Sequence, residues 1–185
     1  LLLEADKKKT ALSSLLQLKD YYFLTLIHSG LGKIYELNDD REKSVAAYLK
    51  VVDMCEAMGM RTRLSWHYLN VGNGFMALSE EEKAEHYFRK AIETSDDISR
   101  YARASAYANL GYCYYEKRLF EEALELFDRA ETLYKEKSEE DFKNFAIIES
   151  WRGRLYAETG ETDKATHHFA EAFDLAKKVQ DYKQL

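Results

Sequence analysis

The sequence of 185 residues contains no proline and only two cysteines, and each shortage excludes a class of protein. Without proline, no proline-rich linker or rigid spacer divides the chain. Cys55 and Cys113 lie in separate apolar runs and form no CxxC pair, so no zinc-finger or thioredoxin-type motif is present. We expect both thiols to be reduced and buried, as in a cytoplasmic protein.

Basic charge and long apolar runs are also scarce. The 27 Lys and Arg residues stand against 33 Asp and Glu residues, which gives a net charge of −6. The one cluster of cations is Lys7-Lys8-Lys9. Nucleic-acid binding needs a basic patch, so we expect no nucleic-acid partner. No stretch approaches the roughly 18 apolar residues of a membrane span, so we expect no membrane partner.

Motifs of catalysis and of metal binding are missing too. The chain has no glycine-rich phosphate loop, no GxSxG and no HExxH sequence. His167 and Glu171 are four residues apart on one predicted helix, but no third metal ligand accompanies them. We therefore predict that the protein is not an enzyme and holds no metal ion and no cofactor.

What the sequence does contain is a pattern of small and aromatic residues that occurs four times. Its marker is a glycine, with spacings of 40, 39 and 42 residues between Gly32, Gly72, Gly111 and Gly153. A small residue follows each glycine by twelve positions, and an aromatic residue follows it by sixteen: Tyr48, Phe88, Phe127 and Phe169. Antiparallel helices approach closely only where a side chain is nearly absent, so each copy predicts a packed helix pair.

The stretch Ala104–Ala130 shows the pattern most completely, with Leu110-Gly111, Tyr114, Ala123, Phe127 and Ala130. This order resembles the tetratricopeptide repeat, a helix-turn-helix unit. Four copies in register, over about Tyr22 to Lys178, make the resemblance specific. The repeat length of about 40 residues resembles the subtype of kinesin light chain and of bacterial Rap-type regulators. Two departures are the missing proline that usually closes the repeat, and Arg152 where the fourth copy should have Leu.

The resemblance implies an all-α fold, a right-handed α-α superhelix of four helix-turn-helix repeats plus an N-terminal helix. We expect one solenoid domain over residues 1–185, with repeats at about 20–59, 60–97, 98–137 and 139–181. An extra helix over 1–18 is expected to belong to a truncated repeat, with Asp20 beginning the next helix. The chain does not begin with Met, and we expect it to be excised from a larger protein.

Local signals predict where helices begin and end. Gly59 and Gly160 are expected to end helices in a left-handed conformation. Ser79-Glu80-Glu81-Glu82 has the form of a capping box, in which the Ser79 side chain and Glu82 satisfy each other's backbone donors. The sequence therefore predicts that a helix begins directly after Ser79.

The first helix of each pair should line the concave face, so ligand-binding residues should lie on a stripe around each marker glycine. Asparagine carries a donor and an acceptor and can pair with any peptide backbone unit. Tyrosine and tryptophan offer apolar anchors with a polar edge, and cations can hold carboxylates. The predicted peptide-binding residues are Asn70, Asn73, Asn109, Tyr112, Lys33, Trp66, Tyr115 and Arg154.

These residues favour a protein- or peptide-binding scaffold that uses its concave groove. The same asparagines and tyrosines could instead serve only to fill the solenoid. Two other functions also remain open. The chain could be the sensory domain of a bacterial signalling or transcription regulator, or a module that forms homo-oligomers through the ends of the solenoid.

Overall fold

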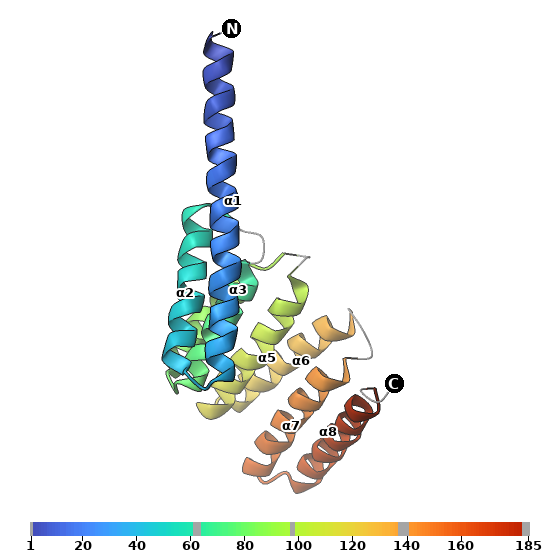
Figure 1. Cartoon of the computed structure of the whole chain (residues 1–185). Coiled ribbons are helices and arrows are strands. Elements are labelled where there is room, and N and C mark those ends of the chain that lie inside the picture. Colours follow the sequence, from blue (N-terminus) through green and yellow to red (C-terminus); the bar gives the residue numbers. More distant parts are fainter. Residues whose placement is uncertain (1, 61–63, 97–98, 137–140, 183–185) are drawn as a thin grey trace.

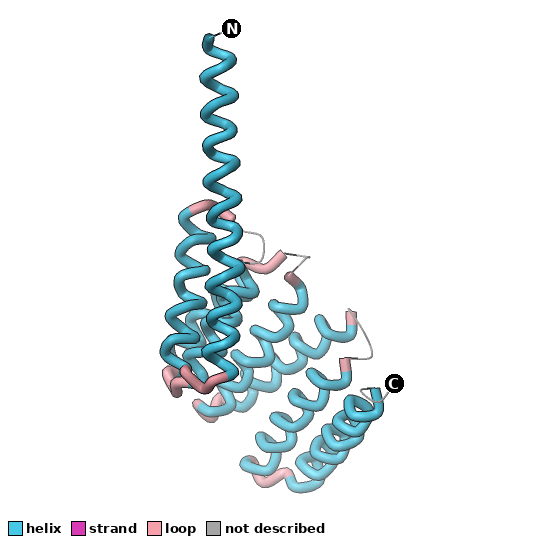
Figure 2. The backbone as a smooth tube through the Cα atoms, in the orientation of Figure 1, coloured by secondary structure: helices cyan, strands magenta, loops and turns pink. Residues whose placement is uncertain are grey.

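The computed structural model describes residues 2–60, 64–96, 99–136 and 141–182, with side chains described between residues 19 and 180 of these ranges. The described residues form eight α-helices and no strand. The helices are α1 (Leu2–Leu37), α2 (Arg41–Ala57), α3 (Leu64–Ala77), α4 (Glu81–Glu93), α5 (Arg100–Glu116), α6 (Phe120–Lys135), α7 (Phe142–Glu158) and α8 (Thr162–Tyr182). Figure 1 shows them following one another as antiparallel pairs, and Figure 2 shows short turns within each pair.

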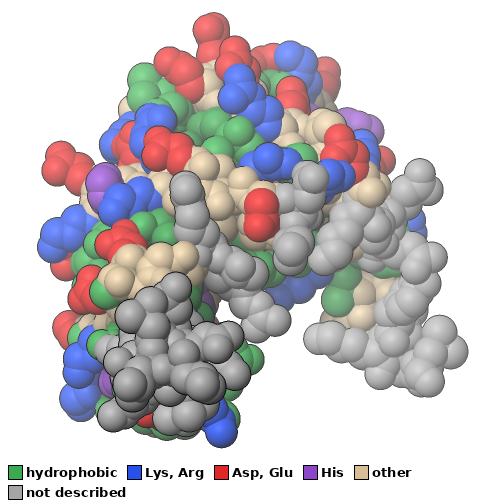
Figure 3. All heavy atoms as spheres, turned by 90° about the horizontal axis from the view of Figure 1, so that it is seen from above, with side chains coloured by type: hydrophobic (Ala, Val, Ile, Leu, Met, Phe, Trp, Pro, Cys, Tyr) green, Lys and Arg blue, Asp and Glu red, His purple; other side chains and the backbone are tan. Residues whose placement is uncertain are grey.

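The four helix pairs stack into an arc. Each first helix packs along its second helix, and α3 and α5 also pack on the second helix of the pair before them. The first helices also meet one another, since α3 contacts α5 and α5 contacts α7. Figure 3, seen from above, shows an outline that is hollowed on one side. The fold is therefore the predicted solenoid, with its first helices on the inner, concave side.

The marker glycines allow the two helices of each pair to meet. A Cβ atom built at any of the four would lie 2.5–2.9 Å from the ring of the aromatic residue sixteen positions later. At Gly111 that ring belongs to Phe127, which is fully buried. Each copy of the pattern is therefore a packed helix pair, as the sequence predicts, and the aromatic ring itself lies against the glycine.

The turn inside each pair has one shared geometry. The residue at the turn has positive φ in all four repeats: Asp39 (58°), Ser79 (58°), Arg118 (61°) and Gly160 (82°). In the second repeat, the Glu80 N–H donates to the Phe75 carbonyl at 2.9 Å, and the Ser79 N–H donates to the Met76 carbonyl at 2.9 Å. These two bonds satisfy carbonyls at the end of α3, as in a Schellman motif.

Two turn predictions therefore have different outcomes. Gly59 and Gly160 do end helices with φ values of 62° and 82°. The capping box at Ser79 was wrong, because α4 begins at Glu81, after Glu80, and has no side-chain cap. Ser79 lies in the turn that follows α3, where its backbone has a left-handed conformation, and the residue before α4 is Glu80.

The helix predicted over 1–18 is not separate from its successor. α1 runs without a break from Leu2 to Leu37, so the expected start at Asp20 was wrong. Residues 15–25, LLQLKDYYFLT, contain no glycine or proline that would end a helix, and an aspartate inside a helix costs little. As Figure 1 shows, the N-terminal part of α1 extends well beyond α2.

Both cysteines are buried and unbridged, as predicted. Burial raises the pKa of the Cys113 thiol to about 11, so this thiol stays protonated at neutral pH. In the part of the chain that the structure describes, no helix combines the length and apolar character needed to cross a bilayer.

The glycine contacts predict a graded effect of substitution. Gly111→Ala should destabilise the protein by about 1–3 kcal/mol through overpacking, offset in part by the helix propensity of alanine. Gly153→Ala should cost clearly less, because the opposing Phe169 ring is 42% exposed and can move aside. Urea unfolding of both variants and the wild type measures the difference. Equal losses of unfolding free energy in the two variants would show that the contact with the ring does not limit how closely the helices approach each other.

Candidate functional site

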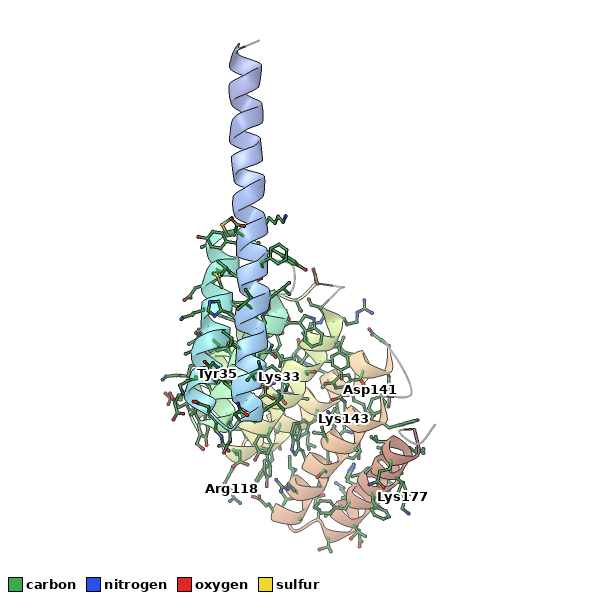
Figure 4. The ribbon with its side chains drawn as sticks, viewed as in Figure 1. Lys33, Tyr35, Arg118, Asp141, Lys143 and Lys177 are labelled. Atoms are coloured by element: carbon green, nitrogen blue, oxygen red, sulfur yellow. The ribbon has the colours of Figure 1, made fainter. Side chains whose placement is uncertain are left out.

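A cavity lies on the concave side, between α1, α2 and α3. Its volume is about 650 Å³. Lys33 and Glu36 line it from α1, and Asn70 and Asn73 line it from α3. Tyr48 of α2 also contributes to its wall. The structure thus brings together three of the predicted binding residues, which come from the first helices of two neighbouring repeats. Figure 4 labels Lys33 near the end of α1.

Asn109 joins this group from α5. Its Nδ2 donates a hydrogen bond of 2.7 Å to Oδ1 of Asn73, across the boundary between the second and third repeats. Nδ2 of Asn73 can still donate a hydrogen bond to a ligand, and Oδ1 of Asn109 can still accept one. A peptide backbone unit needs one donor and one acceptor, so the asparagine pair remains able to bind one.

Lys33 already has an internal partner. Its Nζ lies 2.6 Å from Oε1 of Glu36, and both side chains are more than half exposed. The other carboxylate oxygen of Glu36 accepts a hydrogen bond of 3.2 Å from the Tyr48 hydroxyl. Burial, followed by the charge of Glu36, raises the pKa of Tyr48 to about 12, so the hydroxyl remains a donor. Exposed ion pairs contribute less than about 1 kcal/mol, so a ligand carboxylate can compete with Glu36 for Lys33.

The predicted aromatic residues form a second region, toward the third and fourth repeats. Tyr112 packs against Trp151 of α7, with 5.1 Å between ring centroids, and against Tyr115 at 5.8 Å. Tyr115 is buried and donates its hydroxyl to Glu158, so it offers no surface to a ligand. Trp66 stacks on Tyr101 at 5.6 Å, which joins α3 to α5. Tyr112 and Trp66 are only partly buried, and each stacks on an aromatic ring of the next repeat.

Arg154 is exposed on α7, and its charge acts on both Tyr112 and Tyr115. The Tyr112 pKa is nevertheless raised, first by a hydrogen bond to Glu116 and then by burial. The predicted residues therefore divide into a polar part around Asn73 and an aromatic part around Tyr112, with Arg154 beside the second.

Two residues of the polar part, Glu36 and Tyr48, were not among the predicted binding residues, although Glu36 lies on the predicted groove stripe. The spacing of three residues between Lys33 and Glu36 on one helix was a usable signal for their ion pair. Tyr48 was recognised only as the aromatic residue of its repeat. Nothing in the sequence indicates that its hydroxyl reaches the groove, because this depends on how closely α2 approaches α1.

Arg152, the departure in the fourth repeat, lies outside the groove. It is buried between α6 and α7, where its guanidinium contacts Asp128 at 2.5 Å, Glu131 at 2.7 Å and Glu149 at 2.5 Å. The Nδ1 of His168 lies 2.5 Å from the other oxygen of Glu149. Ionic contacts thus surround the position that Leu31, Val71 and Leu110 occupy in the other repeats. No group of three or more His, Cys, Asp or Glu side chains among the described residues could hold a metal ion.

The class of the protein follows from this architecture: an all-α solenoid of stacked helix pairs with an open concave groove. Residues 27–57 and residues 63–136 both match family models described as the tetratricopeptide repeat. The chain therefore contains tetratricopeptide repeats, which form a scaffold of the kind that serves protein interaction. The kinesin light chain or Rap-type subtype stays a prediction.

Similar solved structures support the fold. BtubC (BKLC) from P. vanneervenii has a TM-score of 0.70 and 23% identity, over 86% of this chain and 66% of BtubC. MamA has a TM-score of 0.61 and 20% identity, over 96% of both chains. A double mutant, MamA RS-1 ArsTM, has a TM-score of 0.56 and 17% identity, over 83% of this chain and 75% of its own. The chain thus spans about two thirds of BtubC. A comparison with curated protein sequences gives no match.

The buried ion cluster predicts a pH-dependent loss of stability in a variant. Arg152→Leu should cost about 3 kcal/mol at pH 7, because it leaves carboxylates partly buried without their cation. Burial alone would raise the pKa of Glu131, but hydrogen bonds from Lys135 and Arg152 hold this pKa below its ordinary value. This stabilisation is present above the ordinary pKa and is lost as the pH falls, so the difference from wild type should shrink in acid.

Thermal unfolding between pH 7 and pH 3 tests this. Arg118→Leu is the matched control, since Arg118 is exposed and lies 3.7 Å from Glu158. It should cost less than about 1 kcal/mol at any pH. Similar losses for both variants would contradict a stabilising role of the buried cluster.

Proposed function

We propose that the protein is a binding scaffold that holds an extended segment of a protein partner in its concave groove. The observation that carries the proposal is the row of Asn70, Asn73 and Asn109 beside a cavity of about 650 Å³. Amide side chains on two adjacent first helices can pair with successive backbone units whatever the partner's side chains are. Lys33 and Arg154 add cations for its carboxylates, and Tyr112 adds an apolar contact.

Energetics favour this use of the asparagines. A hydrogen bond from a side chain typically contributes about 0.5–1.5 kcal/mol to binding. Replacing Asn70 and Asn109 together should therefore weaken partner binding by about 1–3 kcal/mol, or roughly fivefold to a hundredfold. Truncating these partly exposed amides leaves the helix pairs packed, since neither residue belongs to the buried core.

The test compares partner capture by wild type with capture by the Asn70→Ala/Asn109→Ala variant, followed by affinity measurement on the purified partner. Lys50→Ala/Asp53→Ala is the control, because both residues are exposed on α2 and the pair of changes leaves the net charge unaltered. Thermal unfolding verifies that all three proteins are folded. A partner that binds the asparagine variant as tightly as the wild type would overturn the groove assignment.

A second function, self-association through the end faces, is favoured by exposed apolar residues on α1. Phe23, Ile27 and Ile34 are 51%, 56% and 53% exposed. The same repeat positions in α5 hold Ala102, Ala106 and Cys113, which are all buried. In an inner repeat, this stripe packs on the helix pair before it. On α1, the same stripe is exposed and could pack on a helix pair of another copy.

The last helix pair, α7 and α8, forms the other end face of the solenoid. Phe173 of α8 is 61% exposed, beside a cavity of about 350 Å³ that Ile147 and Trp151 of α7 also line. In the repeat before, Glu131 at the corresponding position contacts Arg152 of α7 at 2.7 Å. We propose that the α1 face of one copy covers the α7–α8 face of another. Such head-to-tail contacts do not close on themselves and extend into chains of copies.

Mixing two variants tests this arrangement. Ile27→Asp should block one face and Phe173→Asp the other, so each alone should be a monomer by light scattering, while the wild type forms larger species as its concentration rises. A mixture of the two variants retains one intact interface and should stop at a dimer. A wild type that stays monomeric at millimolar concentration would exclude self-association.

A further inference from the structure

A pocket on the outer side of the third repeat contains two arginines without carboxylate partners. Its volume is about 370 Å³, and Arg103, Tyr107, Asp128, Arg129, Thr132 and Leu133 line it, from α5 and α6. Neither arginine side chain has a hydrogen bond or ion pair with any residue that the structure describes. The Nε atom of Arg103 is also buried, and a buried donor without a partner is costly.

Most other described arginines are paired. Those that contact a carboxylate are Arg41, Arg89, Arg100, Arg118 and Arg152. Acidic residues outnumber basic ones in this chain, so a missing partner is not explained by a shortage of carboxylates. Two of the unpaired guanidinium groups nevertheless line one pocket.

The carboxylate inside the pocket is already engaged. Asp128 contacts Arg152 of α7 at 2.5 Å, and this contact belongs to the buried cluster that joins α6 to α7. Arg129 contacts the ring of Tyr107 at 5.9 Å, a cation–π contact that orients the guanidinium without neutralising it. Two positive charges without an ion pair thus line the pocket, beside one carboxylate that Arg152 holds and whose side chain is 72% exposed.

This pocket is distinct from the concave groove. Tyr107 is two residues before the groove residue Asn109 on α5, and Arg103 is about one turn before Tyr107 on the same side of the helix. Two residues along an α-helix correspond to a rotation of about 200°, so the arginine side of α5 faces away from the groove side. Occupation of one site therefore does not block the other.

We propose that this outer pocket binds an anionic group, a carboxylate or a phosphate, on a side chain of a protein partner. Planar guanidinium groups match the oxygens of both anions with two parallel hydrogen bonds, and two such groups around one cavity favour a group with several oxygens. The anion supplies the partners that Arg103 and Arg129 lack. It also places a second contact with a partner on the face opposite the groove.

The test uses three capped five-residue peptides that differ only at the central position, which is phosphoserine, glutamate or serine. Binding is followed by NMR, through the Nε–Hε signals of arginine in the ¹⁵N-labelled protein. We expect the anionic peptides to shift the signals of Arg103 and Arg129 and the serine peptide to leave them unchanged. Arg103→Lys and Arg129→Lys keep the charge but lose the planar guanidinium group, which can donate two parallel hydrogen bonds. Each substitution should weaken binding at least about tenfold.

Arg118→Lys is the matched control, since it makes the same change at an exposed arginine outside the pocket. Its affinity for the peptides should equal that of the wild type. Binding of the phosphoserine peptide alone identifies a phosphorylated partner, and binding of the glutamate peptide as well identifies an acidic segment. Absence of binding by both anionic peptides at millimolar concentration would overturn the proposal. Equal binding by Arg103→Lys, Arg129→Lys and wild type would do so as well.

Discussion

The contact on which this structure depends is the approach of an aromatic ring to a glycine within each helix pair. Without a side chain at Gly111, the Phe127 ring lies where a Cβ atom would otherwise stand, and the two helices close on each other. The same contact occurs in all four pairs, so every pair has a similar separation and orientation. A regular solenoid, and with it a continuous concave face, follows from repeating one local constraint.

The connections between pairs are less uniform than the pairs themselves. Aromatic rings stack across both boundaries, as Trp66 does on Tyr101 and Tyr112 on Trp151, but only between the third and fourth repeats does the structure describe a buried arginine with three carboxylates, Arg152. Apolar stacking depends little on pH, while an ionic cluster depends on it through groups such as Glu131. The solenoid thus has the same construction within its pairs and different chemistry at their boundaries.

The sequence predicted most of the fold because glycine and aromatic spacing report directly on helix pairing. Two predictions from the sequence were wrong. At Asp20, a polar residue inside a long helix was taken for the first residue of a helix. At Ser79, the residue adopts the left-handed conformation of the turn and does not cap the next helix. The groove residues were predicted by register, and Lys33, Asn70 and Asn73 do share a cavity. The burial of Tyr115 and the reach of Tyr48 depend on packing between helices far apart in sequence, which register alone does not contain. Cytoplasmic location and an origin in a larger protein stay predictions.

The hydrogen bond between Asn73 and Asn109 has a mechanical consequence, since it crosses the boundary between two repeats. A ligand that formed hydrogen bonds with either amide would break this direct bond between α3 and α5. The two helices would then be connected through the ligand. Occupancy and curvature at this boundary would then be coupled, and the coupling acts in both directions. Tension that straightened the arc at this point would loosen the ligand, and a bound ligand would stiffen the arc against such tension.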